Sequence, residues 1–379
     1  MRPPASALRR SALAFVVSRA IVWVAGVTAA LSLDYSADPT NRPIALGHTA
    51  EVLSAPAVRW DAVWYLDIAR DGYTSGLHAV FFPLYPLVVR AVSFVLGSLI
   101  VAGVVVSCVA FLAALVALRR LTEHELGARA ADRTVWLMAL FPASLFFSAV
   151  YAESLFLALT VGAFLSAREG RWRRAALLGA AAGATRNTGW LLIVPLALMY
   201  RGEAGRLDRG ALWLLLVPLG AVGFWAYQWA HFGDPLTGAH AERWWGRQFV
   251  GPLRGVQYIA ENVWHTSSYL LHGERLGSDL HQIALLALLA AALVAFAGVV
   301  RRLPAAYWVW TAIGLVVAIS APIPEFPLWS TPRFLAVLFP LFMWAGDALR
   351  PRVYALALAV FAVGLAFVSA EFATWHFVS

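Results

Sequence analysis

The stretch LIVAGVVVSCVAFLAALVAL, residues 99–118, contains no charged residue and is followed directly by Arg119 and Arg120. A helix needs about 20 apolar residues to cross the hydrocarbon core of a bilayer, so this stretch predicts a transmembrane helix. Similar apolar stretches recur along the chain. The further predicted spans are residues 11–33, 134–150, 153–167, 211–230, 281–300, 304–320, 333–348 and 353–372.

The composition agrees with a membrane protein. The 379-residue chain is 61% hydrophobic and only 13% charged, whereas soluble domains carry about a quarter charged residues. This excludes a soluble globular protein, a disordered chain and a nucleic-acid-binding protein, despite a formal net charge of +8. The abundance of alanine and arginine, with no lysine at all, suggests a bacterial source.

The arginines predict the orientation. Basic residues concentrate in cytoplasmic loops of membrane proteins, and in our layout 18 of the 29 arginines fall in cytoplasmic segments, including the N-terminus. Of the 21 acidic residues, 14 fall on the outer side. We therefore expect an all-α polytopic protein of the cytoplasmic membrane. It would form a single domain over residues 1–379, with about nine to eleven transmembrane helices and large outer loops at about 34–79 and 231–280.

Two apolar segments are irregular. Residues 80–97 contain Pro83, Pro86 and Arg90, which favours a juxtamembrane or partly inserted helix. Residues 175–200 are interrupted by the sequence TRNTG and have arginine-rich flanks on both sides. If both flanks are cytoplasmic, this segment enters the membrane and returns as two half-helices with Arg186 at the tip. Interrupted helices at membrane depth are tolerated where they line a cavity, so the tip is a candidate site.

The first outer loop carries the sequence RWDAVWYLDIARDGY, residues 59–73. It predicts a helix from about Pro56 to Asp71, ended by Gly72 because glycine accepts a positive φ at a helix C-terminus. At helical spacing Trp60, Trp64 and Asp67 share one face. Two interpretations stay open: the aromatic residues anchor an interfacial helix and the carboxylates are solvated, or a carboxylate stands at the mouth of a cavity.

Four sequence blocks, in order, resemble the PIG-V-type mannosyltransferases, which are membrane enzymes of the GT-C glycosyltransferase class. The first includes RWD at 59–61 and FFPLYP at 81–86, and the third is TRNTG at 185–189. The other two lie within residues 141–156 and 332–342. The resemblance implies a GT-C-like helix bundle. It also implies an enzyme that takes mannose, or another hexose, from a polyprenyl-phosphate-linked donor on the outer face and transfers it to a lipid- or protein-linked acceptor.

The resemblance also implies a set of site residues. Asp61 is the expected catalytic base, because the family places its catalytic acid in this first loop. Arg186 and Arg333 are expected at the departing phosphate, since the planar guanidinium group suits phosphate oxygens. Glu153 would orient an acceptor hydroxyl or support Arg186. The expected substrate-binding residues are Arg59, Trp60, Tyr65, Asp67, Tyr85, Glu153, Arg186 and Arg333.

A metal site is not expected in the second outer loop. Its histidines, His231, His240, His265 and His272, show none of the spacings typical of metal ligands. A divalent cation that assists the phosphate would leave no motif.

Two other functions remain open. The same charged residues would suit a transporter or flippase for a lipid-linked sugar, against which the lack of an internal repeat argues. The second of these alternatives is a non-catalytic scaffold subunit.

Overall fold

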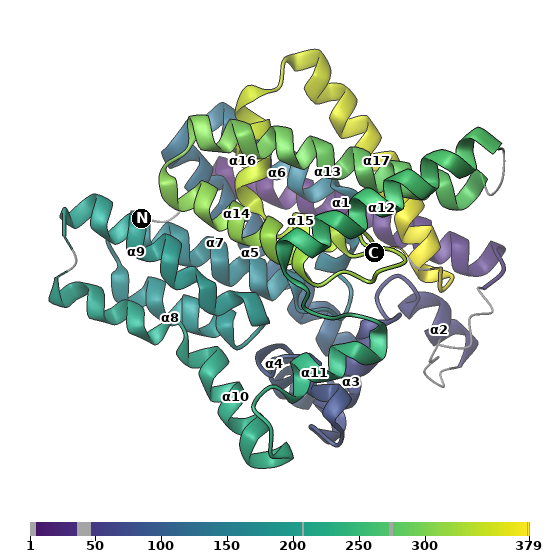
Figure 1. The fold of residues 1–379 in the computed structure, drawn as a ribbon, viewed down its shortest axis with the longest axis horizontal. Coiled ribbons are helices and arrows are strands. Elements are labelled where there is room, and N and C mark those ends of the chain that lie inside the picture. Colours follow the sequence, from purple (N-terminus) through teal and green to yellow (C-terminus); the bar gives the residue numbers. More distant parts are fainter. Residues whose placement is uncertain (1–4, 36–46, 207, 273–275, 377, 379) are drawn as a thin grey trace.

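The structure, a computed structural model, describes residues 5–35, 47–206, 208–272, 276–376 and 378; residues 5–7, 265–272 and 276–280 are described by backbone alone. The described residues are almost entirely helical, and their only β-type pairing is an isolated bridge between Ile323 and Phe326. Part of the predicted first outer loop, residues 36–46, lies outside the described residues. Figure 1 shows the helices packed around a central group that includes α1, α5, α6 and α7.

The helices follow one another in a single series. In chain order they are α1 (Ala5–Ser32), α2 (His48–Ser54), α3 (Asp61–Asp71), η1 (Gly76–Val80), α4 (Leu84–Leu96), α5 (Leu99–Leu126), α6 (Ala128–Leu140), η2 (Pro142–Phe147), α7 (Glu153–Arg168), α8 (Trp172–Gly183), η3 (Asn187–Leu192), α9 (Ile193–Ala204), η4 (Arg209–Leu216), α10 (Leu219–Phe232), α11 (Thr237–Ala241), η5 (Glu242–Trp245), α12 (Gly251–His272), α13 (Leu276–Arg302), α14 (Ala305–Ser320), α15 (Thr331–Ala336), α16 (Phe339–Ala348) and α17 (Pro351–Ala373).

Several predicted spans are helices long and apolar enough to cross a membrane. Within the described residues these are Leu8–Ser32, Leu99–Leu126, His281–Arg302 and Pro351–Ala373. The predicted span 211–230 is a bent pair, η4 and α10, with an angle of 41° at the break. The all-α polytopic class is therefore confirmed, while the total of nine to eleven spanning helices stays a prediction.

Prolines divide two of the predicted spans. The span predicted at 134–150 is wrong as one continuous helix: α6 ends at Leu140 and the chain continues as the short η2, which begins at Pro142. The span predicted at 333–348 is divided into α15 and α16 just before Pro340. Proline has no N–H to donate, and its ring clashes with the preceding turn of a helix. The predicted spans 153–167 and 304–320 are single helices, α7 and α14, of 16 residues each.

The first outer loop differs from the prediction at its start. The helix ends at Asp71 before Gly72, whose φ is 79°, as expected. It begins at Asp61 rather than near Pro56, because Trp60 has a φ of 54° and interrupts the helical backbone. The segment predicted as a partly inserted helix at 80–97 contains α4.

The interrupted segment contains the two predicted half-helices. α8 and α9, of 12 residues each, are joined by a break at 184–186 and by η3. Arg186 lies in this link, at the opposite end of α8 from the arginine-rich stretch 168–174, a separation of about 18 Å along the helix axis. Both half-helices extend from the middle of the molecule toward the left of Figure 1.

A buried arginine connects the first span to the core. Arg19 on α1 is 7% exposed and donates hydrogen bonds of 2.7 Å to the Ser144 carbonyl and to the Ser148 hydroxyl. Its guanidinium also lies 4.9 Å from the centre of the Phe111 ring. A cation in an apolar interior is tolerated when its donors are satisfied, so Arg19 fixes α1 against the irregular segment that follows α6.

Small residues allow α8 and α10 to approach closely. A Cβ on Gly220 of α10 would overlap the backbone oxygen of Ala180 on α8, whereas a Cβ on Gly223 would meet no atom within 4 Å. Ala180 is one of the small residues of 179–183, which therefore serve close helix packing.

We predict that Gly220→Ala destabilises the protein by about 1–3 kcal/mol, because the added methyl group overpacks a backbone contact. Gly223→Ala is the matched control on the same helix and should be neutral or slightly stabilising. Thermal unfolding in detergent micelles measures both. Equal melting temperatures for the two variants would contradict the close packing of α8 and α10.

Candidate active site

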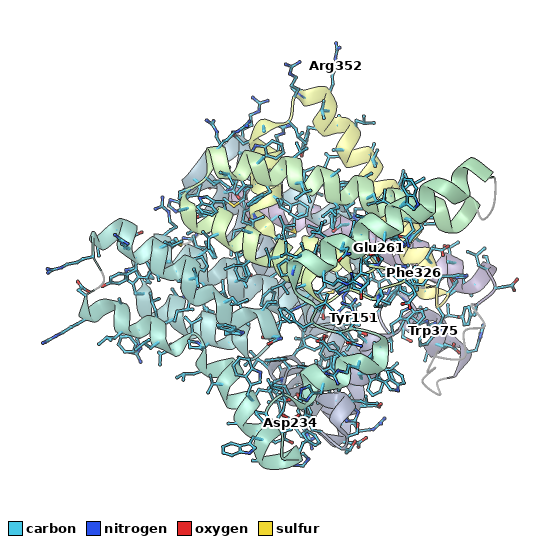
Figure 2. The ribbon with its side chains drawn as sticks, in the orientation of Figure 1. Tyr151, Asp234, Glu261, Phe326, Arg352 and Trp375 are labelled. Atoms are coloured by element: carbon cyan, nitrogen blue, oxygen red, sulfur yellow. The ribbon has the colours of Figure 1, made fainter. Side chains whose placement is uncertain are left out.

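Asp61 is the first residue of α3, directly after the strained Trp60. The Tyr151 hydroxyl fixes this turn: it donates to the Arg59 carbonyl and accepts from the Asp61 backbone N–H, both at 3.1 Å. Figure 2 labels Tyr151 near the centre of the molecule. A positive φ in a residue other than glycine costs free energy and persists where the surroundings hold it. Tyr151 therefore fixes the backbone position from which the Asp61 side chain extends.

Glu153 is the first residue of α7 and has no exposed surface. Its Oε1 accepts a hydrogen bond of 2.6 Å from Nη1 of Arg186. The same oxygen accepts two more from Arg333, from Nε at 2.9 Å and from Nη2 at 2.6 Å. A buried carboxylate is tolerated when cations pair with it, so Glu153 holds both guanidinium groups in place.

Arg333 extends the network to the first outer loop. Its Nη1 lies 2.7 Å from Oδ2 of Asp61. Asp61, Glu153, Arg186 and Arg333, which we call the ion-pair cluster, thus come from four separate regions of the chain. Arg186 and Arg333 meet at Glu153, and Asp61 joins them through Arg333.

The ion-pair cluster is buried on one side and accessible on the other. The side chain of Glu153 is fully buried, while those of Asp61, Arg186 and Arg333 are 28%, 17% and 16% exposed. Aromatic rings support the cations: the Arg333 guanidinium lies 4.9 Å from the centre of the Tyr151 ring. Part of the Asp61 carboxylate and of both guanidinium groups is therefore accessible from the surface.

Arg247 adds a third guanidinium group beside the cluster. It comes from the second outer loop and donates to the Ser330 hydroxyl and, at 3.4 Å, to the Ala321 carbonyl. Burial lowers its pKa from the ordinary value, and Arg333 and Asp61 are among the charges that act on it. Arg247 was not among the expected site residues; the available signal was its position two residues after Trp244-Trp245.

Several predicted site residues pack in the interior instead. Arg59 is 3% exposed and donates from Nε to the Ala373 carbonyl at 2.9 Å, away from the cluster. Trp60 meets Trp375 edge to face at 5.6 Å. Tyr85 is fully buried, with its hydroxyl 2.8 Å from the Ser107 hydroxyl. The structure does not bring these three side chains into the cluster.

The two remaining predicted residues lie on α3 but outside the cluster. The Tyr65 ring is 6% exposed and packs at 5.0–6.3 Å from the rings of Phe81, Tyr85 and Tyr151. Burial raises the pKa of its hydroxyl. Asp67 pairs with Arg70 at 2.8 Å and lines a separate open pocket at the other end of the helix.

The described residues include no group of three or more His, Cys, Asp or Glu side chains that could hold a metal ion. His231 and His240 lie apart from the ion-pair cluster: His231 contacts the Tyr73 carbonyl and His240 pairs with Asp234. The side chains of His265 and His272 lie outside the described residues.

The fold is similar to that of a solved protein. The chain is similar to ArnT from Cupriavidus metallidurans, whose crystal structure is bound to undecaprenyl phosphate. The TM-score is 0.52 at 15% sequence identity, and the superposition covers 93% of this chain and 62% of that chain. The predicted GT-C-like helix bundle is therefore confirmed.

Sequence comparisons point to a family that the first half of the chain resembles. Residues 15–201 match the family model described as Mannosyltransferase (PIG-V). Over 146 residues the chain is 34% identical to GPI mannosyltransferase 2 of Cryptococcus neoformans, and over 174 residues it is 31% identical to GPI alpha-1,6-mannosyltransferase 2 of Cricetulus griseus. The predicted resemblance to the PIG-V-type mannosyltransferases is thereby confirmed over this part of the chain.

These matches are partial. They cover 35% and 41% of this chain and 34% and 35% of the two relatives. The chain thus spans about a third of the length of the curated relatives that it matches. The family match contains Asp61, Glu153 and Arg186, whereas Arg333 and Arg247 lie beyond it.

We predict that Glu153→Gln destabilises the protein by about 3 kcal/mol, because it removes the shared counter-charge of two partly buried guanidinium groups. Glu261→Gln is the control: its carboxylate is 49% exposed and lies 4.0 Å from Arg254, and such exposed pairs contribute little. Thermal unfolding of both variants tests the difference. A melting temperature of Glu153→Gln equal to that of the wild type would show that the buried ion pairs do not hold the site together.

Proposed function

We propose that the protein is a membrane glycosyltransferase that moves a mannosyl, or another hexosyl, residue from a polyprenyl-phosphate-linked donor to a lipid- or protein-linked acceptor. The reaction would take place on the outer face of the cytoplasmic membrane. The observation that carries this proposal is the ion-pair cluster: an accessible carboxylate beside guanidinium groups that a buried glutamate fixes in place. The family match and the GT-C-like fold support it.

The reaction requires a proton acceptor and a site for the leaving group. The acceptor hydroxyl oxygen attacks the anomeric carbon of the donor sugar and forms the new glycosidic bond. The bond from that carbon to the phosphate oxygen breaks, and the polyprenyl phosphate leaves with the electron pair. The hydroxyl proton passes to a carboxylate, which acts as the general base.

Asp61 suits the role of the base. It is the one carboxylate of the cluster with an exposed side chain, at 28%. Oδ2 faces Arg333, which fixes the plane of the carboxylate, while Oδ1 accepts no hydrogen bond from the described residues. Glu153 is unsuited, because it is fully buried and its Oε1 already accepts three hydrogen bonds.

The arginines suit the departing phosphate. Arg186 and Arg333 offer planar donors whose orientation Glu153 has already set, and Arg247 adds a further positive charge. Preorganised donors stabilise the charge that develops in a transition state without reorganising during the reaction. The isoprenoid chain of the donor would lie along the exposed apolar helices of the bundle.

The outer-face location rests on the distribution of charge. Arginine-rich stretches lie at the start of α8 and at the ends of α9 and α13, and such stretches are typical of the cytoplasmic side. Arg186 lies at the opposite end of α8, so the cluster would face outward. By the same reasoning the N-terminus would lie in the cytoplasm.

A transporter or flippase for a lipid-linked sugar is the second candidate, because paired charges also line translocation paths. It would move the carrier across a bilayer without breaking the bond to the sugar. A scaffold subunit would tolerate replacement of Asp61 without any loss of function.

We predict that Asp61→Asn lowers sugar transfer by at least about 100-fold, since the general base contributes roughly 100- to 10,000-fold. Asp347→Asn is the matched control: Asp347 on α16 also pairs with an arginine, at 2.9 Å, and is 23% exposed, but it lies outside the cluster. Initial rates with a radiolabelled polyprenyl-phosphate mannose donor measure both. Near-normal transfer by a folded Asp61→Asn protein would reject Asp61 as the base.

We predict that Arg186→Gln lowers the turnover number about 100- to 1,000-fold, which is the usual effect of removing one preorganised donor at a transition-state charge. Arg174→Gln, an exposed arginine on α8, should leave the rate unchanged. Single-turnover kinetics with saturating donor separate this effect from weaker binding. A loss confined to donor affinity would contradict a transition-state role.

A further inference from the structure

A second polar site lies at the other end of α3. It is an open pocket of about 490 Å³, within the size range of ligand sites, roughly 300–1,000 Å³. We call it the tryptophan pocket. Its lining includes Trp64, Trp244, Asp67, Asp71, Thr74 and Ser75.

The two outer loops build this pocket together. α11 of the second loop packs on η1 of the first, and Gly238 lies so close to the Ala79 carbonyl that a side chain at that position would overlap it. The Gly238 N–H also donates to Gln228 on α10 at 2.8 Å. These contacts place Trp244 edge to face with Trp64, with ring centres 6.1 Å apart.

The two tryptophans differ in exposure. Trp64 is 8% exposed and forms the floor, whereas Trp244 is 59% exposed and presents an indole ring to solvent. A large aromatic side chain fixed between two loops and yet open to water offers a flat apolar surface for a ligand. The apolar face of a sugar ring has the matching shape.

Polar groups surround the aromatic surface. Asp67 and Asp71 both pair with Arg70 at 2.8 Å, yet they remain 23% and 49% exposed, so their oxygens can accept hydrogen bonds from hydroxyl groups. Thr74 and Ser75 add hydroxyl groups of their own. Aromatic faces combined with carboxylate and hydroxyl oxygens match the chemistry of a neutral carbohydrate.

The charges distinguish this pocket from the ion-pair cluster. Asp67, Asp71 and Arg70 leave one net negative charge in the tryptophan pocket. The cluster is balanced by two carboxylates and two guanidinium groups, and Arg247 makes its surroundings positive. A lipid phosphate is therefore favoured at the cluster, and an uncharged sugar is favoured at the pocket.

We propose that the tryptophan pocket binds a neutral sugar unit of the acceptor glycan, the unit adjacent to the one whose hydroxyl reacts at Asp61. This inference rests on the proposed function. Asp61 and Asp67 are separated by six residues of α3, or about 9 Å along the helix axis. A glycan of two or three linked rings is long enough to span this distance.

The test measures binding separately from transfer. Mannotriose is the probe, and saturation-transfer difference NMR with the full-length protein in nanodiscs detects it. Trp244→Ala should weaken mannotriose binding about tenfold, the loss expected for one aromatic surface. Trp229→Ala is the matched control, because Trp229 is 67% exposed on α10 and does not line the pocket; its binding should equal that of the wild type.

Kinetics then identify the sugar. Trp244→Ala should raise KM for the glycolipid acceptor about tenfold, with kcat and the KM for the donor unchanged. A raised KM for the donor would show that the pocket holds the donor sugar and would overturn the proposal. Mannotriose binding that is unaffected by Trp244→Ala, or absent from a wild-type protein that transfers sugar, would overturn it as well. If mannotriose binding depends on Trp244 but no transfer occurs, the sugar site stands and the proposed function fails.

Discussion

The buried charge of Glu153 is the constraint on which the site depends. A carboxylate with no exposed surface must be neutralised and hydrogen-bonded, or its desolvation would cost several kcal/mol. Arg186 and Arg333 meet this requirement from two distant segments of the chain. Because Glu153 fixes both guanidinium groups, the positive surface near Asp61 exists before any ligand arrives, and its geometry needs no substrate to form.

The breaks between helices supply the residues of this cluster. Arg186 lies where α8 ends, Arg333 on the short α15 that ends just before α16 begins, and Asp61 directly after the strained Trp60. A continuous helix would direct these side chains along its own faces, whereas each break frees a residue to turn inward. In the proposed reaction, α3 then carries the base at its first turn and sugar-binding groups at its last, so that phosphate and sugar are recognised by surfaces of different charge.

The sequence predicted the helical class, the half-helices around Arg186 and the residues that meet in the ion-pair cluster, because apolar length and charge are local properties and the four family blocks are distinctive. It did not predict which motif residues pack inside: Arg59 and Tyr85 belong to the same blocks, yet their polar groups bond to Ala373 and Ser107. Tyr151 and Arg247 were not assigned roles, since their importance depends on contacts with residues far away in the sequence. The start of α3 was predicted five residues early, because the periodic pattern of apolar residues does not reveal that Trp60 has a positive φ.

The most direct test of the central claim follows both products of the proposed reaction. Purified protein in nanodiscs is incubated with polyprenyl-phosphate mannose, labelled separately in the sugar and in the lipid, and with a lipid extract of the host as the source of acceptor. The proposal predicts that labelled sugar enters a new product while an equal amount of free polyprenyl phosphate is released. Sugar and lipid labels that remain in one molecule, although the protein is folded and the carrier is bound, would contradict glycosyl transfer.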